Sequence, residues 1–338
     1  SMLEICLKEN ILLLDHVIVT ALGLEKKESS LAYAVQKVRG EELNRVKEVN
    51  MITALAGKAA GVQVSKNSSG MGGSAKVSIR GVRSVAGDNQ PLYVIDGVPM
   101  LNSTSEQAYS AIGGTANAGN RDGGDGISNL NPEDVESISI LKGAPAAALY
   151  GSQAANGVIL ITTKKGNTVG RRDIHFSTGL TFEKAFSLPE MQNSYGVNDV
   201  TDSWGEKENL TVYDNLGDFF RTGLTSITSV SVNSGNDKLQ TYFSYANTTG
   251  RGILNENKLS KHNINLRETA VLFNSRLKLD GNVNVMKQTV KNKPVSGGFY
   301  MNPLVGLYRF PRGEDLAYYK DNYERYDEDR KLNTQNWH

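Results

Sequence analysis

Apolar and polar side chains alternate in long runs from about residue 167 onward, and this pattern limits the folds open to the chain. In the first run, Ile174, Phe176, Leu180 and Phe182 share one parity of the numbering. Alternation of this kind predicts strands with one apolar and one polar face. Apolar residues of one parity recur in three later runs, at Leu239, Phe243 and Tyr245, at Ile264, Leu266, Ala270 and Leu272, and at Leu277, Leu279, Val283 and Val285. Tyr242 is an exception in the first of these three runs, because it is a large aromatic residue on the polar parity.

Two architectures accommodate such strands, and the alternation alone favours a soluble antiparallel sheet. A soluble sheet needs a second layer over its apolar face, yet no helix pattern in this region carries an apolar stripe. In a transmembrane barrel lipid covers that face, and each run has about the 9–11 residues that cross a bilayer when tilted. Exposure of the apolar faces at residues 174–186 and 275–285 would distinguish the barrel from the soluble sheet.

Residues 25–166 hold most of the glycines and mix short helix and strand patterns. The sequence predicts a helix over Ala54–Ala60 and a hairpin turn at Asp96-Gly97. Residues 102–130 are rich in Gly, Asn, Ser and Asp, which predicts a long loop. Short strands are predicted at Val62–Val64, Val77–Arg80 and Pro91–Ile95.

The stretch Ile127–Gly166 is the densest part of this region, and it contains no catalytic grouping. Asn131 suits a helix N-cap, and the proline that follows it suits the first helical position. Ser137–Ile140 alternates as a half-buried strand does. A short helix is predicted at Ala146–Leu149 and a mostly buried strand at Gly157–Thr163.

Composition and spacing exclude several classes of function. The formal net charge is +1, which gives no electrostatic reason to expect nucleic acid. The single cysteine, Cys6, precludes an internal disulfide, and the four histidines lie too far apart for a zinc site. No apolar run approaches the ~18 residues of a transmembrane helix. Because Asp and Glu pairs lack the spacing of a hydrolase, we expect no catalytic residue, no metal and no cofactor.

Two glycine-rich stretches resemble binding loops, but each lacks residues that such a loop requires. Residues 70–73 lack the Lys-Ser or Lys-Thr pair and the helix of a phosphate-binding loop. Asp122–Gly126 holds two carboxylates, too few for a calcium loop, so we interpret it as a flexible loop. The aromatic residues between Tyr308 and Trp337 are interpreted as loop packing rather than as a ligand platform.

An ordered set of motifs in the middle of the chain resembles one family. Val77–Gly81 is followed by Pro91–Pro99 and then by the block Ile127–Gly166. This set resembles the plug domain of TonB-dependent outer-membrane transporters, and it is most similar to the SusC/RagA type of the Bacteroidetes. Later segments resemble the opening of that family's barrel, namely Pro189–Asn193 with Tyr195-Gly196, then Asp218–Gly223 and Asn302–Leu304.

The resemblance implies an α+β plug domain followed by antiparallel β-strands of an incomplete transmembrane β-barrel. We expect residues 1–24 to be the end of a preceding domain and a linker, residues 25–166 to be the plug domain, and residues 167–338 to be the N-terminal part of the barrel. The family's barrel has ~22 strands, whereas the residues after 166 hold about five or six strand candidates. We therefore expect a small open sheet or pairing between chains.

The resemblance also implies an energy-coupling segment, the TonB box, at Val17, Ile18, Val19, Thr20 and Ala21. Such a segment adds a strand to the sheet edge of its partner by β-augmentation. The implied partner is TonB in the TonB–ExbB–ExbD complex. His16 departs from the family, which more often has an acid at this position. The start of the chain lacks the basic, apolar and small-residue zones of a signal peptide.

Charged residues of the plug motifs are implied to hold the plug in place. Arg80 and Glu136 resemble latch residues that pair with charges on the barrel wall. One such ion pair in a wet interface contributes only ~0–1 kcal/mol, so several can hold a plug that still yields to pulling. The other plug-motif residues implied by the resemblance are Gly81, Asp96, Gly97, Lys142 and Gly143.

The resemblance finally implies an active transporter of the outer membrane that imports oligosaccharides together with a SusD-like lipoprotein. The plug would gate the barrel, and outer-membrane lipid would surround it. Oligopeptides are the alternative cargo within the same class. A soluble carbohydrate-binding or interaction protein, built from a mixed domain and a sheet, is the alternative outside that class.

Overall fold

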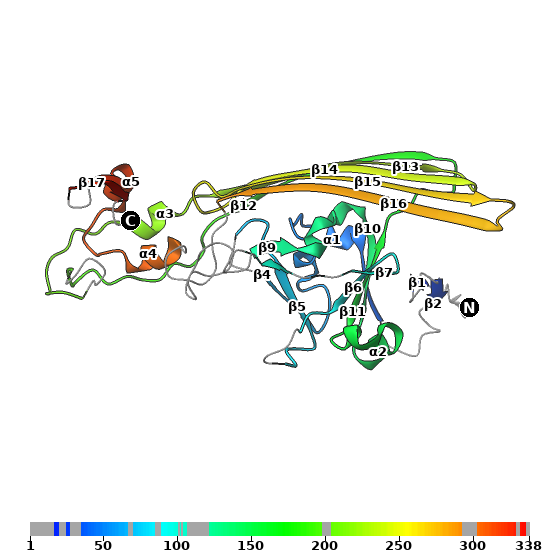
Figure 1. Cartoon of the computed structure of the whole chain (residues 1–338), viewed down its shortest axis with the longest axis horizontal. Coiled ribbons are helices and arrows are strands. Elements are labelled where there is room, and N and C mark those ends of the chain that lie inside the picture. Colours follow the sequence, from blue (N-terminus) through cyan, green and yellow to red (C-terminus); the bar gives the residue numbers. More distant parts are fainter. Residues whose placement is uncertain are drawn as a thin grey trace, which may run out of the picture.

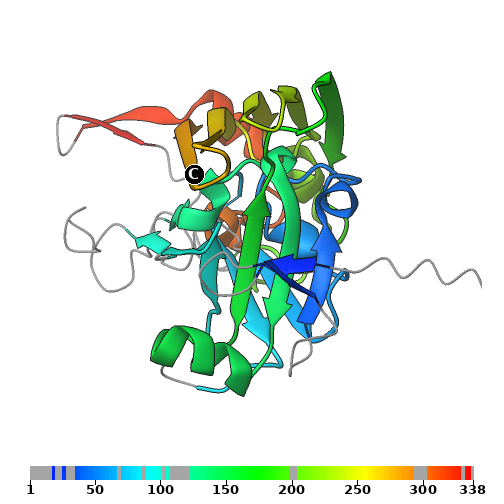
Figure 2. The same cartoon turned by 90° about the vertical axis from the view of Figure 1, so that its right-hand side faces the viewer.

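The computed structural model has two parts, a compact region of short elements and a long sheet that lies along one side of it (Figure 1). We call these the plug region, residues 35–163, and the wall, strands β12 to β16. Figure 2 shows the wall strands end-on above the plug region. The structure describes residues 17–19, 25–27, 35–66, 70–84, 89–100, 102, 104–106, 122–197, 204–292, 303–328 and 332–335.

A five-stranded mixed sheet forms the centre of the plug region. Its order is β3-β10-β11-β6-β7, in which β11 and β6 are parallel and the other neighbours are antiparallel. The strands are β3 (Val35–Arg39), β6 (Leu92–Ile95), β7 (Val98–Met100), β10 (Val135–Leu141) and β11 (Val158–Thr163). The Asp96-Gly97 turn between β6 and β7 is confirmed, and both residues have the positive φ of a tight hairpin, +48° and +89°.

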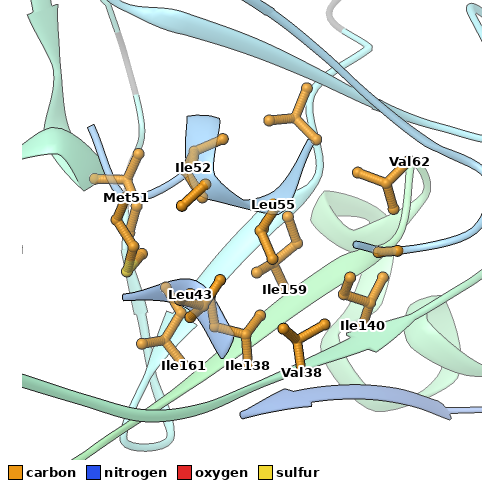
Figure 3. Packing of buried hydrophobic residues seen from close by; sticks show 14 of the residues in the cluster. Val38, Leu43, Met51, Ile52, Leu55, Val62, Ile138, Ile140, Ile159 and Ile161 are labelled. Carbon is orange, nitrogen blue, oxygen red and sulfur yellow. The ribbon is translucent and has the colours of Figure 1, made fainter. Parts of the chain in front are cut away.

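Apolar side chains cover both faces of this sheet. On one face, Ile138, Ile140 and Ile159 join a cluster with Leu43 and Leu55 (Figure 3). The cluster on the other face consists of Val94, Leu141, Ala146, Ala154, Val158 and Leu160. The prediction of a half-buried strand at Ser137–Ile140 is therefore wrong, because β10 lies between two other strands and is packed on both sides.

The remaining elements of the plug region are short. The helices are α1 (Gly40–Leu43), α2 (Ala144–Tyr150), and the 3-10 turns η3 (Thr53–Leu55), η5 (Gly126–Asn129), η6 (Pro132–Asp134) and η7 (Gly151–Ala154). Two antiparallel hairpins are β4 (Val62–Lys66) with β5 (Ala75–Ile79), and β8 (Thr104–Glu106) with β9 (Asp122–Asp125). The predicted N-cap is confirmed, since the Asn131 side chain accepts a hydrogen bond from the Glu133 N–H at the start of η6.

Two sequence predictions in this region are wrong. The helix expected over Ala54–Ala60 is reduced to η3, because Gly57 takes a φ of +74° and interrupts the helical path. The long loop expected over residues 102–130 contains β9 and η5 among its described residues. Short runs of small and polar residues thus form a strand and a 3-10 helix here, because they make hydrogen bonds with neighbouring backbone groups.

Five long antiparallel strands in consecutive order form the wall. They are β12 (Arg172–Glu183), β13 (Gly223–Gly235), β14 (Leu239–Arg251), β15 (Lys258–Leu272) and β16 (Leu277–Lys291). The predicted open sheet and its alternation are confirmed. Its apolar face is exposed, with Ile174 75% and Val283 61% accessible, and no element of the described ranges covers it (Figure 1). This exposure favours the barrel strand over the soluble sheet.

The two ends of the wall differ in their connections. Residues 236–238 and 273–276 form short turns at one end. At the other end lie α3 (Asn215–Phe219), α4 (Pro303–Arg309) and α5 (Leu316–Asp321), near the hairpin of β17 (Glu324–Asp327) and β18 (Leu332–Gln335) (Figure 1). None of the described helices has the length and hydropathy needed to cross a membrane.

Candidate functional site

The polar face of the wall meets the plug region, and plug residues 128–134 lie along it against β14 and β15. The Nζ of Lys261 donates to the carbonyl oxygen of Ser128, and the Nδ2 of Asn263 donates to that of Asn129 at 2.9 Å. Both wall side chains are buried. Because they bind backbone oxygens, these contacts depend on the path of the plug chain rather than on its side chains.

Asp134 ends this segment and is completely buried beneath β14. The hydroxyl of Tyr242 donates to its Oδ1 at 3.0 Å, which explains why an aromatic residue occupies the polar parity of that strand. Burial raises the pKa of the Asp134 carboxyl, while the hydrogen bond from Tyr242 and the charge of Lys164 act in the opposite direction. The carboxyl therefore holds a proton more readily when it is seated against the wall than it does in water.

Arg267 of β15 makes the main ionic contact between wall and plug, and its side chain is only 5% exposed. Its Nη1 lies 2.9 Å from Oδ2 of Asp96 and 2.6 Å from Oγ1 of Thr163, both in the plug region. Its Nε and Nη2 each lie 2.9 Å from a carboxylate oxygen of Asp280 on β16. Bidentate bonding fixes the plane of the guanidinium, so Asp280 directs the remaining edge of Arg267 toward the plug.

Asp96 is held in position for this contact by its own turn. Its Oδ1 accepts the Thr163 N–H at 3.0 Å, and its Oδ2 accepts the Thr163 hydroxyl at 2.6 Å. A positive φ is tolerated by aspartate better than by most residues, and Gly97 completes the turn. Asp96 is the sequence-predicted plug-motif residue that the structure brings to the wall.

Lys47 connects the plug region to the first strand of the wall. Its Nζ pairs with the Glu133 carboxylate and bonds to the Ser177 hydroxyl of β12. The lysine stem passes over Gly179, where an added Cβ would lie only 2.8 Å from the Lys47 Cδ. A glycine at this position on the inner face thus leaves room for a plug side chain.

A second wall glycine receives plug loop 70–74, at the end of the wall away from the short turns. A Cβ at Gly250 of β14 would overlap the methyl carbon of Met71 and lie 3.0 Å from its sulfur. One at Gly72 would lie 3.0 Å from the Val290 side chain of β16. A cavity of about 290 Å³ lies beside this contact, between the loop and the connection from β14 to β15.

The predicted TonB box is only partly within the described residues. Val17–Val19 forms strand β1, which pairs antiparallel with β2 (Glu25–Lys27). Both strands lie toward the end of the molecule that carries the short wall turns (Figure 1). Thr20 and Ala21 lie outside the described residues, and the role of the segment stays a prediction.

The two predicted latch residues lie apart from the contacts above. Arg80 is exposed at the end of β5, with a φ of +61°, and Gly81 follows it with a φ of +87°. Glu136 is exposed on β10. Within the described ranges neither charged group forms an ion pair with the wall, and their pairing with barrel charges stays a prediction.

Lys142 and Gly143 contribute to the plug region itself. The Nζ of Lys142 donates to Oε1 of Gln36 at 2.8 Å and to the carbonyl oxygen of Ala60 at 2.6 Å. Gly143 takes a φ of +85° immediately before α2. These residues stabilise the packing within the plug region, and neither takes part in the contacts with the wall described above.

The interpretation of Asp122–Gly126 as a flexible loop is wrong. Asp122 accepts hydrogen bonds from the backbone N–H groups of Ser74 and Gly124 at 2.7 and 2.8 Å. Asp125 accepts from the N–H groups of Ala75 and Ser128 at 2.9 and 3.0 Å. The two carboxylates therefore hold three backbone segments together. In the part of the chain that the structure describes, no group of three metal-ligating side chains occurs.

Sequence reasoning did not identify the wall residues that contact the plug. These residues share their place in the sequence pattern, because all of them lie on the polar parity of strands whose other face is apolar. A soluble sheet would show water-facing polar residues at the same positions. Charged side chains within the strands were the available clue, as in Lys261, Arg267 and Asp280.

A mixed plug region seated on the polar face of a sheet that is apolar on its other face defines the class of TonB-dependent receptors. The match to a family model supports this class, since residues 27–158 match the TonB-dependent Receptor Plug Domain. The predicted resemblance to the SusC/RagA type of these receptors is confirmed. The predicted fold class, a plug domain followed by antiparallel strands of an unclosed barrel, is confirmed.

The relatives extend over both parts of the chain. TonB-dependent receptor SusC of Bacteroides thetaiotaomicron is 30% identical over 306 residues, which is 88% of this chain and 28% of SusC. TonB-dependent receptor P26 of Formosa agariphila is 35% identical over 180 residues, 53% of this chain and 16% of P26. The RagAB peptide importer in its open-open state has a similar fold, with a TM-score of 0.64 at 23% identity, covering 95% of this chain and 38% of that one. This chain therefore spans less than a third of the length of SusC.

Proposed function

We propose that the full-length receptor containing this chain is an outer-membrane active transporter that imports oligosaccharides together with a SusD-like lipoprotein. The observation that carries the proposal is the similarity to SusC, which extends through the plug region into the wall strands. No covalent chemistry is required, because the function is to bind cargo, open a path and close it again.

The geometry supports a gating mechanism. Several separate polar contacts hold the plug on the wall, centred on Arg267, Lys47 and Tyr242. Because these contacts are separate from one another, a pulling force can break them in sequence. TonB would apply this force by adding a strand to Val17–Ala21. Short turns mark the periplasmic end of bacterial barrel strands, and the position of β1 toward the short-turn end supports the proposal that TonB acts on this segment.

Growth of the native host on defined carbon sources tests the transport proposal. A strain without the full-length gene should lose growth on one oligosaccharide class and keep growth on the corresponding monosaccharide. A plasmid copy should restore growth, and a copy lacking Val17–Ala21 should not. Loss of growth on oligopeptides alone would replace the proposed cargo class, and full uptake by the Val17–Ala21 deletion would exclude this segment as the TonB box.

Affinity purification of the tagged full-length receptor from outer membranes tests the partner. We expect one surface lipoprotein to co-purify at a near-equal ratio in mild detergent. A tagged outer-membrane barrel from the same strain that lacks a plug domain is the matched control. Recovery of the receptor alone, under conditions that preserve the plug's contacts, would contradict a stable lipoprotein complex.

A further inference from the structure

The contacts between plug and wall described above are polar, but the contact that Met71 of loop 70–74 makes with the wall is apolar. Met71 is only 9% exposed and packs its thioether against the inner face of β14. Gly72 lies against the side chains of Val290, Gln288 and Leu259. Shape rather than charge therefore holds the Met71 side chain on the wall.

The fit of Met71 depends on the glycine beneath it. The next residues of the same parity along β14 are Thr248 and Ala246, which carry side chains on the inner face. Gly250 leaves a notch in this row, and the Met71 methyl carbon occupies the space that a Cβ would fill. The hydroxyl of Thr225, on the neighbouring strand, would lie 3.3 Å from that Cβ and bounds the notch. A flexible thioether suits such an irregular space.

The position of this contact gives it a function. The cavity beside it lies toward the end of the wall that carries α3, α4 and α5, opposite the short turns. A solute that enters from this end meets the cavity first and the Met71 contact next. The polar contacts of Lys261 and Arg267 lie farther along β15 toward its short-turn end.

We propose that Met71 seated in the Gly250 notch is the outer seal of the plug, the contact that closes the gap between plug and wall on the cargo side. This inference rests on the proposed gating function. An apolar contact is suited to sealing because it excludes water over its whole area. It also separates without leaving a buried charge unpaired, so the loop can lift before the ionic contacts break.

Conductance of the purified full-length receptor in planar lipid bilayers, without cargo or TonB, tests the seal. Gly250→Val fills the notch and should raise the leak conductance by at least about tenfold, because overpacking displaces the thioether. Gly281→Val is the matched control, since a Cβ at Gly281 of β16 meets no atom within 4 Å. We expect no change from this control.

A compensating pair separates a seal from general damage. Met71→Ala alone should also leak, because it empties the notch, whereas Met71→Ala with Gly250→Val moves the volume from plug to wall and should restore tightness. A receptor lacking the plug region sets the maximal leak. Tight single variants beside a leaking plug deletion would overturn the seal and leave the gating proposal intact. A tight plug deletion would overturn the gating proposal and the seal with it. If Gly250→Val does not insert, Met71→Ala decides by the same readout.

Discussion

At the scale of single residues, one contact that holds the plug is a buried cation that two carboxylates share. Asp280 and Asp96 face Arg267 from the wall and from the plug, respectively. Burying a cation is costly unless its hydrogen bonds are satisfied, and here five nitrogen-to-oxygen contacts satisfy it. The arrangement contributes more to the register of plug and wall than to net stability.

Replacing Arg267 with glutamine should lower the free energy of unfolding by about 3–5 kcal/mol, because two carboxylates lose their buried counter-charge. Denaturant unfolding in detergent micelles measures the change. Combined with Asp96→Asn, a double-mutant cycle should give a coupling of about 0.5–3 kcal/mol. The exposed pair of Arg171 and Asp173 is the control, with an expected coupling of about 0–1 kcal/mol. Equal couplings in both pairs would contradict a special role for Arg267.

Asp134 predicts a pH dependence of plug seating. Its pKa is raised in the seated state, so that state binds more protons than the unfolded state does. The stabilisation is complete below the usual aspartate pKa of 3.8 and declines as pH rises through the raised value. Melting temperature measured against pH should fall across this window. Asp134→Asn should flatten the profile, and an unchanged slope in that variant would assign the dependence to another group.

Residue-level prediction from sequence succeeded where backbone geometry demands a residue type and failed where a partner lies far away in the chain. Asp96 and Gly97 form a turn that the two residues specify by themselves. The partner of Asp96 is Arg267, more than 170 positions later, and nothing local links them. The alternation indicated which face Arg267 occupies, whereas the contact could be found only in three dimensions.

At the scale of elements, each wall strand has two faces with different surroundings. β15 shows this best, because its buried residues include Lys261, Asn263 and Arg267, while Ile264 and Leu266 are exposed. The period of two made this division predictable from sequence. The run over Ala54–Ala60 was not predictable in the same way, because one backbone conformation at Gly57 outweighs the helix propensity of its neighbours.

A charge on the outward face should be tolerated according to its depth in the membrane. Leu266→Arg, near the centre of β15, should destabilise the full-length receptor in lipid vesicles by about 2–4 kcal/mol. Ser260→Arg, on the same face near the strand end, should cost only about 0–1 kcal/mol. Urea unfolding in vesicles measures both. Equal costs at the two depths would indicate that water rather than lipid contacts this face.

At the scale of the whole molecule, a domain with a continuous core lies on a sheet that has no second layer within the described residues. The plug core of Ile138, Ile159 and Leu55 is complete in itself. The wall, by contrast, uses the plug only on its inner face and leaves its outer face uncovered. Both parts could be predicted from the sequence because the spacing of their apolar residues differs. The polar contacts that join the two parts could not, because the residues that make them have the same pattern as residues that face solvent.

The consecutive order of β12 to β16 has a consequence for biogenesis. These strands follow the plug in the chain, and within the described residues they pair only with their sequence neighbours. The part of the plug-binding surface that β12 to β16 form is therefore complete once residue 291 has been placed. A barrel that grows strand by strand in this order would close around a plug domain that is already docked to its first strands. No folded domain would then have to be threaded into a closed ring.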